Sequence, residues 1–173
     1  MSDGWPKPVK LHELGRGPVR LRLEPDAEAR ARIARELDLI GLPALSAELT
    51  VNPWFDGAEI TGRFQAVVEQ TCSVSLDPFE QPLAGQVEVR VVPRGSPHAI
   101  SDEMTEVEFD LESPDPPDVL DIDEIDVGAY LVEALALEID PFPRKPGVEF
   151  DYAPPTEEVS PFAVLKGLKD SKP

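Results

Sequence analysis

The fold is decided by the stretch DVLDIDEIDVGAYLVEALALEIDPFPRKP, residues 118–146. It begins as a short, acid-rich alternating segment, continues as a strongly apolar one and ends in a proline cluster. The apolar residues that share one helix face are Val127, Tyr130, Leu131, Ala134 and Leu135, and those that widen it are Val132, Ala136, Leu137 and Ile139. We therefore expect a helix over about 126–139, capped by Asp126 and covered on most sides by the rest of the core.

A second helix is expected over about 26–40. Asp26 is a suitable N-cap, and the sequence AEARARIARELDL that follows it is rich in strong helix formers. Its narrow apolar stripe consists of Ile33, Ala34, Leu37 and Ile40. The other faces carry Arg30, Arg32 and Arg35. We interpret these arginines as a solvated face paired with local acids, and a contact surface is the alternative.

Most of the remaining chain before residue 110 alternates between apolar and polar residues, which predicts strands. The expected strands cover 19–23, 45–51, 60–74, 86–92 and 105–109, with a short edge strand at 9–11. Residues 53–57 read as a hairpin turn, and Asp77 and Pro78 as a break. Positions 119, 120, 122 and 125 are expected to be buried.

The predicted fold class is α+β, with an antiparallel, meander-like sheet packed by the two helices. A strongly curved or partly closed sheet is an option within this class. We expect a partly flexible segment 1–17, a single domain 18–150 and a mobile tail 151–173 in which 160–169 has the pattern of a short helix.

Charge is the unusual quantity of this sequence. Lys and Arg total 16 against 34 for Asp and Glu, which gives a net charge of −18 and a pI of about 4.3. Phosphate backbones should be repelled by such a surface, whereas a basic partner should be attracted. The simpler interpretation is that the acidity only keeps the protein soluble.

No catalytic, cofactor or metal motif is present. Cys72 is the only cysteine, so no internal disulfide or cysteine-based zinc cage can form within one chain. His12 and His98 are expected in Pro/Gly-rich loops, and the sequence contains no Gly-rich phosphate-binding loop. The calcium-loop pattern does not fit either. Counted from Asp121, it would require an oxygen ligand at the position of Ile125 and a glycine at the position of Asp126. We interpret Cys72 as a small buried residue. We predict no catalytic residue, no cofactor and no metal ligand.

No stretch of the sequence is apolar for long enough to span a membrane, and the N-terminal MSDGWPKPVKL lacks an apolar signal region. We expect a cytoplasmic protein that does not enter a membrane.

Two stretches resemble one protein family. VVEQTCSVSLDPF, residues 67–79, resembles the C-x-R-C-L-x-P motif of the YceD family, the large ribosomal RNA subunit accumulation proteins of bacteria and plastids. Residues 120–146 resemble its acidic segment, apolar helix and Pro-x-x-Pro-like end; the matching positions are Asp121, Asp126, Glu133, Pro141 and Pro143. Ser75 replaces the second cysteine of many members, Val74 replaces the usual arginine, and later cysteines are absent. Any metal role of such cysteines cannot operate here.

The resemblance implies a non-enzymatic factor that supports synthesis, processing or accumulation of large-subunit rRNA during ribosome assembly. Combined with the charge, it predicts binding to a basic ribosomal protein or assembly factor, with rRNA contacted indirectly. The residues predicted to contact this partner are Asp121, Asp123, Glu124, Asp126, Glu133, Arg144 and Lys145. Two other functions stay open: an acidic nucleic-acid mimic or general interaction module, and a metal-dependent hydrolase using the 121–126 carboxylates. The oligomeric state stays open too.

Overall fold

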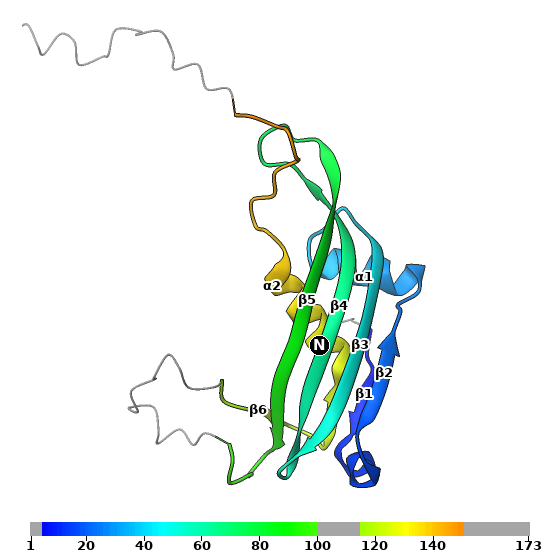
Figure 1. The fold of residues 1–173 in the computed structure, drawn as a ribbon, viewed down its shortest axis with the longest axis vertical. Coiled ribbons are helices and arrows are strands. Elements are labelled where there is room, and N and C mark those ends of the chain that lie inside the picture. Colours follow the sequence, from blue (N-terminus) through cyan, green and yellow to red (C-terminus); the bar gives the residue numbers. More distant parts are fainter. Residues whose placement is uncertain (1–4, 100–114, 151–173) are drawn as a thin grey trace, which may run out of the picture.

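The computed structural model describes residues 5–99 and 115–150, which form an α+β fold with one main sheet and its helices on one face (Figure 1). The strands are β1 (Pro8–Lys10), β2 (Val19–Leu23), β3 (Gly41–Trp54), β4 (Gly57–Thr71), β5 (Pro78–Pro93), β6 (Asp118–Leu120) and β7 (Glu124–Asp126). The helices are the 3-10 helix η1 (Leu11–Arg16), α1 (Ala27–Glu36) and α2 (Val127–Glu138). Within these described residues, neither α-helix is long and apolar enough to cross a membrane.

The main sheet has the order β2-β3-β4-β5-β6 and is mixed. The pairs β2–β3, β3–β4 and β4–β5 are antiparallel, as predicted; tight turns join the last two pairs, and residues 24–40, which include α1, connect β2 to β3. The prediction of a purely antiparallel sheet was wrong, since β6 pairs with β5 in parallel, through Val91 and Asp118 at one end. Residues 94–117 separate these two strands, which is long enough for the chain to return in the same direction.

Several predicted strand boundaries were wrong. β5 begins at Pro78 instead of residue 86, because pairing with β4 extends through a segment whose apolar alternation is weak. β4 ends at Thr71, short of the predicted residue 74, and the β3–β4 turn is only Phe55 and Asp56. The edge strand expected at 9–11 is β1, which pairs with β7. The strand predicted at 105–109 and the helix predicted at 160–169 lie outside the described residues.

Helix α1 forms where it was predicted but is shorter. The Asp26 carboxylate accepts a hydrogen bond from the Ala29 N–H at 2.8 Å, and Ile33 and Ala34 are buried. Ile40 was predicted to lie on the apolar stripe, but it is exposed because the helix ends before it and β3 begins at residue 41.

The three arginines of α1 have different roles. Arg32 pairs with Glu28 at 2.9 Å, as predicted for a solvated face. The Arg30 guanidinium instead donates to the carbonyl oxygens of Pro25 (2.8 Å) and Leu42 (3.1 Å). Arg35 Nε donates to the Ala31 carbonyl at 3.3 Å. Arg30 therefore fastens α1 to the start of β3.

Helix α2 packs on the sheet with one face only. Val127, Leu131 and Leu135 are fully buried between the helix and the sheet, whereas Leu137 is 87% exposed. The prediction that the helix is covered on most sides was therefore wrong, because no described element packs on its outer side. The space between α2 and the sheet is narrow at Gly85 of β5, where a Cβ atom would lie 2.6 Å from the ring of Phe64 on β4 and 2.9 Å from Glu138 Cγ of α2.

The acidic lead-in to α2 is also less buried than predicted. Ile125 is fully buried, but Val119 and Ile122 are exposed and Leu120 is half-buried. β6 and β7 are three-residue strands, each with one partner, so little structure covers their side chains.

The Asp126 carboxylate joins this lead-in, α2 and the N-terminal strand. Its Oδ1 accepts hydrogen bonds from the backbone N–H groups of Gly128 (3.0 Å), Ala129 (3.2 Å) and Lys7 (2.9 Å). The first two cap α2, as predicted, and the third holds the chain beside β7. A Cβ atom at Gly128 would lie 2.1 Å from the Trp5 carbonyl oxygen, so glycine is needed where the N-terminal segment crosses the helix.

We expect Leu131→Asp to lower the free energy of unfolding by at least about 3 kcal/mol, because it places a carboxylate in the core. Leu137→Asp on the same helix should change it by less than about 0.5 kcal/mol, since residue 137 is exposed. Urea denaturation followed by circular dichroism measures both. Equal losses would contradict the one-sided packing of α2.

Gly128→Ala should destabilise the fold by about 1–3 kcal/mol, because the added methyl group must displace the N-terminal segment. The matched control is Gly15→Ala, where nothing lies within 4 Å of the position that the new methyl group would occupy. Hydrogen exchange should locate the effect of Gly128→Ala in β1 and β7. Unchanged protection of β1 would show that the segment does not depend on this close approach.

Candidate functional site

The seven predicted contact residues lie in different parts of the fold. Asp121, Asp123 and Glu124 come together at the end of the sheet where β6 and β7 lie. Asp126 is at the same end but is half-buried and occupied by the three N–H groups. Glu133 is on the exposed side of α2. The remaining two, Arg144 and Lys145, follow α2 and lie near the turn between β4 and β5, at the other end of the sheet.

The end of the sheet with β6 and β7 is called the acidic end below; its carboxylates are Asp118, Asp121, Asp123 and Glu124. Asp121 forms an ion pair with Arg94. Among the described residues, no Lys or Arg forms an ion pair with the other three. The backbone carbonyl of Asp123 accepts a hydrogen bond from the Leu11 N–H at 3.1 Å, so this segment is held by its main chain. Asp121 is paired with Arg94 and Asp118 accepts a hydrogen bond from Tyr130, which leaves the carboxylates of Asp123 and Glu124 to interact with solvent or a partner.

Asp118 extends the acidic end along α2. Burial raises the pKa of Tyr130 well above its ordinary value, and the charge of Asp118, which also accepts a hydrogen bond from the Tyr130 side chain, raises it further. Burial and the charge of Asp118 likewise raise the pKa of Glu133. The second of these two causes, the repulsion between Asp118 and Glu133, is one that a nearby cation would offset.

The negative charge of the chain is concentrated in its second half. Residues 100–150 contain 16 of the 34 acidic residues and only two of the 16 basic ones. Residues 5–99 are nearly balanced, with 13 acidic and 11 basic residues. The acidic end therefore belongs to the most negative part of the sequence.

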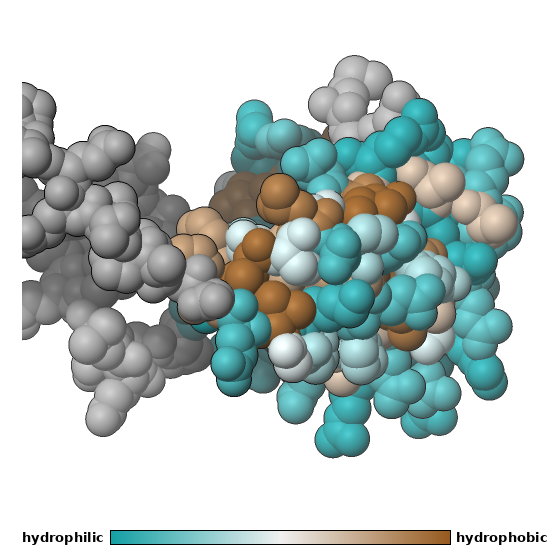
Figure 2. Space-filling view, turned by 90° about the horizontal axis from the view of Figure 1, so that it is seen from above, coloured by the Kyte–Doolittle hydropathy of each residue, from teal (hydrophilic) through white to brown (hydrophobic). Residues whose placement is uncertain are grey.

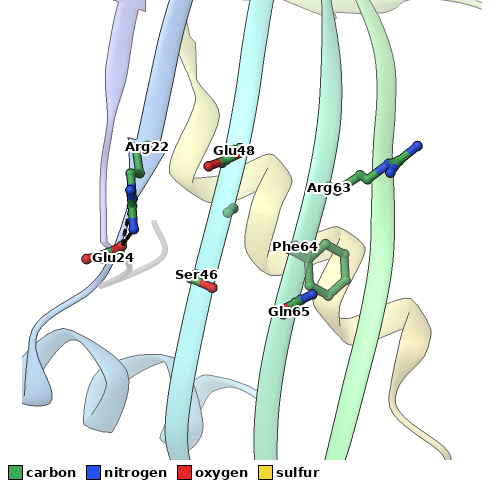
Figure 3. A pocket seen from close by; sticks show the side chains of 8 residues that line it. Arg22, Glu24, Ser46, Glu48, Arg63, Phe64 and Gln65 are labelled. Carbon is green, nitrogen blue, oxygen red and sulfur yellow. Dashed lines mark hydrogen bonds and ion pairs between the residues drawn. The ribbon is translucent and has the colours of Figure 1, made fainter.

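The face of the sheet opposite the helices is a polar surface with a shallow groove of about 330 Å³ (Figure 3). Arg22, Glu48 and Arg63 are register neighbours on β2, β3 and β4, so opposite charges alternate across the strands. Arg22 also pairs with Glu24 at 2.8 Å, and the side chain of Arg63 points away from the groove (Figure 3). The groove is not lined by any His or Cys. This mixed-charge surface has no converging set of catalytic groups.

Carboxylate-based metal chemistry has no visible centre in the described part of the chain. Over residues 5–99 and 115–150, no group of three or more His, Cys, Asp or Glu side chains could hold a metal ion. Near the predicted 121–126 cluster, Asp126 is used as a helix cap and Asp121 as the partner of Arg94.

The two stretches that resemble family motifs meet at the turn between β4 and β5. The Ser73 N–H donates to the Pro143 carbonyl at 2.8 Å, and the Lys145 N–H donates to Cys72 Sγ at 3.4 Å. Sγ also accepts from the N–H groups of Val74 and Ser75, each at 3.4 Å. Seen from this end, apolar residues lie between hydrophilic ones (Figure 2). The segment after α2 is thus attached to the β4–β5 turn by backbone hydrogen bonds, one of which is accepted by Cys72 Sγ.

Cys72 is fully buried, as predicted, but its environment is polar. Hydrogen bonding from the Ser75 side chain, and then from the N–H groups of Ser75 and Lys145, lowers the pKa of the Cys72 thiol from 9.0 to about 6, although burial opposes the shift. These donors favour the thiolate, so ionisation strengthens the connection between the turn and residues 143–145.

We expect the urea concentration at the unfolding midpoint to increase when the pH is raised from 6 to 9. The folded-state pKa of Cys72 is lowered to about 6 from 9.0. Its stabilising contribution is therefore complete above pH 9 and is lost as the pH falls towards 6. Urea denaturation at several pH values checks this, with Cys72→Ala as the comparison, in which this part of the rise should disappear. The same pH profile in both proteins would show that the thiolate does not contribute. The range from pH 6 to pH 9 lies below the ordinary pKa of tyrosine, so ionisation of Tyr130 does not contribute to this change in stability.

An aromatic cluster at the acidic end was not predicted from the sequence. Trp54 and Phe55 lie at the tip of the β3–β4 hairpin, and His98 from the segment after β5 stacks on Phe55. The signal in the sequence was an aromatic pair between Pro53 and Asp56, in a turn where small or polar residues are usual. The contact with His98 has no sequence signal.

Comparison with known protein families identifies the family to which the chain is similar. The model of a protein family described as "Large ribosomal RNA subunit accumulation protein YceD" matches residues 60–169. No curated protein and no solved structure matches the chain. The matched residues include most of β4, all of β5, β6, β7 and α2, and both stretches that meet at Cys72. Since the match covers more than half of the chain, the protein belongs to the YceD family.

Proposed function

We propose that this protein is a non-enzymatic cytoplasmic factor that supports synthesis, processing or accumulation of large-subunit rRNA during ribosome assembly, by binding a basic protein. The partner is a ribosomal protein or an assembly factor. Membership of the YceD family supports the role in large-subunit rRNA. The observation that carries the mode of action is the acidic end, where Asp118, Asp123 and Glu124 have no ion-pair partner among the described residues.

Direct binding to rRNA is disfavoured by how the basic side chains are used. Six of the ten described arginines are engaged within the protein: Arg22 with Glu24, Arg30 with backbone carbonyls, Arg32 with Glu28, Arg35 with the Ala31 carbonyl, Arg90 with Glu59 and Arg94 with Asp121. Phosphate binding requires clustered, available cations. A net charge of −18 adds general repulsion of a polyanion.

A basic protein would be attracted to the same carboxylates that repel RNA phosphates. Its Lys and Arg side chains gain favourable interactions with unpaired carboxylates and lower the repulsion around Glu133. Exposed charges of this kind increase the association rate and make binding sensitive to salt. The protein would then hold its partner near rRNA, with the partner making the RNA contact.

The double variant Asp121→Asn with Asp123→Asn should fold normally, because both side chains are exposed, and should bind its basic partner roughly threefold to tenfold more weakly at low salt. The matched control is Glu36→Gln with Asp38→Asn, which removes the same charge from the exposed end of α1. The measurement is affinity purification from the native cell with and without RNase, followed by titration of the purified partner.

The proposal expects a basic protein that stays bound after RNase treatment and that the control variant retains. A complex that disappears with RNase, or equal weakening by both double variants, would contradict it. Tight and selective binding of purified rRNA fragments at physiological salt would contradict the indirect contact.

A further inference from the structure

Three aromatic rings form a preformed cluster at the tip of the β3–β4 hairpin. Trp54 and Phe55 are arranged edge to face with ring centroids 4.7 Å apart, and His98 stacks on Phe55 at 4.1 Å with an interplanar angle of 19°. Ser96 connects the β3–β4 turn to the segment after β5. Its hydroxyl donates a hydrogen bond to Asp56 Oδ1 at 2.9 Å and accepts one from the His98 N–H at 3.1 Å. We call Trp54, Phe55 and His98 the aromatic tip.

The fold does not account for a phenyl ring at position 55. Phe55 is 70% exposed, and its backbone has φ +49, a left-handed conformation that favours glycine. A glycine would make the same two-residue turn without strain, and little apolar surface is buried by the ring. Strained, exposed residues of this kind are concentrated at functional positions.

The neighbouring residues show which chemistry the tip accepts. The Arg90 guanidinium lies 5.5 Å from the centroid of the Trp54 ring while it pairs with Glu59 at 3.0 Å. An aromatic face beside a carboxylate therefore already holds an arginine in this structure. Phe55, followed by Asp56, repeats that combination at the exposed end of the hairpin.

The aromatic tip and the acidic end are at the same end of the sheet. Ala58, next to the hairpin turn, pairs with Val91 of β5, and Val91 pairs with Asp118 of β6. Both features lie at the lower end of the sheet in Figure 1. Charge complementarity favours a cationic ligand across the two features, because Arg90 and Arg94 are already paired with Glu59 and Asp121 while Asp123 and Glu124 have no ion-pair partner among the described residues.

We propose that the aromatic tip anchors an arginine side chain of a basic protein segment whose other cations contact the acidic end. This inference rests on the proposed function and names the recognised side chain. Trp54 and Phe55 precede the residues matched by the family model, which begin at 60, whereas His98 lies within them. A stacked nucleobase is disfavoured because the carboxylates of the acidic end repel the phosphates that accompany it.

The test uses the full chain and two synthetic decapeptides of equal charge, alternating Gly-Arg and Gly-Lys, with a uridine decamer as the RNA probe. The wild-type protein should bind the arginine peptide roughly two- to fivefold more tightly than the lysine peptide. Phe55→Gly should remove this preference without lowering the unfolding midpoint, since glycine suits φ +49.

The matched control is Leu76→Gly. Leu76 is also exposed (75%) and left-handed (φ +62), but it lies in the turn between β4 and β5 at the other end of the sheet. This variant should keep the preference for arginine. The double variant at Asp121 and Asp123 should instead weaken both peptides equally.

Each remaining outcome decides between the two proposals. An arginine preference that persists in Phe55→Gly, or equal binding of both peptides by the wild-type protein, overturns the arginine anchor and leaves the proposed function standing. Binding of neither peptide overturns both. Binding of the uridine decamer that is lost in Phe55→Gly would assign the tip to nucleobase stacking and overturn the anchor.

Discussion

The fold depends on one carboxylate. Asp126 ends β7, caps α2 and holds the backbone at Lys7, so a single oxygen determines where three segments meet. The Val127 N–H completes the junction by donating to the Lys7 carbonyl at 3.1 Å. The acidic segment that precedes Asp126 is positioned by the same contacts, because β7 pairs with β1 residue by residue. The negative surface and the core are thus built from adjacent residues with different roles: Asp126 is turned inward, and Asp121 and Asp123 are exposed.

The periodicity of apolar residues was sufficient to predict the helices and strands that bury one face. The β3–β4 hairpin and both α-helices were confirmed, since each alternates or repeats against a single covered side and has a cap or a turn at its end. Periodicity could not show that Leu137 is left uncovered, because the pattern records which residues are apolar and not which neighbours are present. Nor could it give the direction of β6, whose three residues carry no signal that distinguishes a parallel from an antiparallel neighbour.

The candidate site was also predicted only in part from the sequence. The run of acids was visible in the sequence, because charge does not depend on how distant segments pack. The separation of Lys145 from that run could not be predicted, since it follows from a contact with Cys72, 73 residues away in the sequence. The stacking of His98 on Phe55 likewise joins two loops that are adjacent only because β4 lies between β3 and β5. Contacts between loops are fixed by the sheet order, which no local pattern encodes.

The one-sided packing of α2 explains why the two family-like stretches belong together. A helix held by a single face can tilt away from the sheet unless both of its ends are fastened. Asp126 fastens the first end, and the Pro143 and Lys145 contacts with the Cys72 turn fasten the segment after the second. The turn does this with Ser75 in place of a second cysteine, because three backbone N–H groups converge on Cys72 Sγ. The turn thus has a structural role, whereas at the opposite end of the sheet the acidic side chains that lead into α2 are exposed.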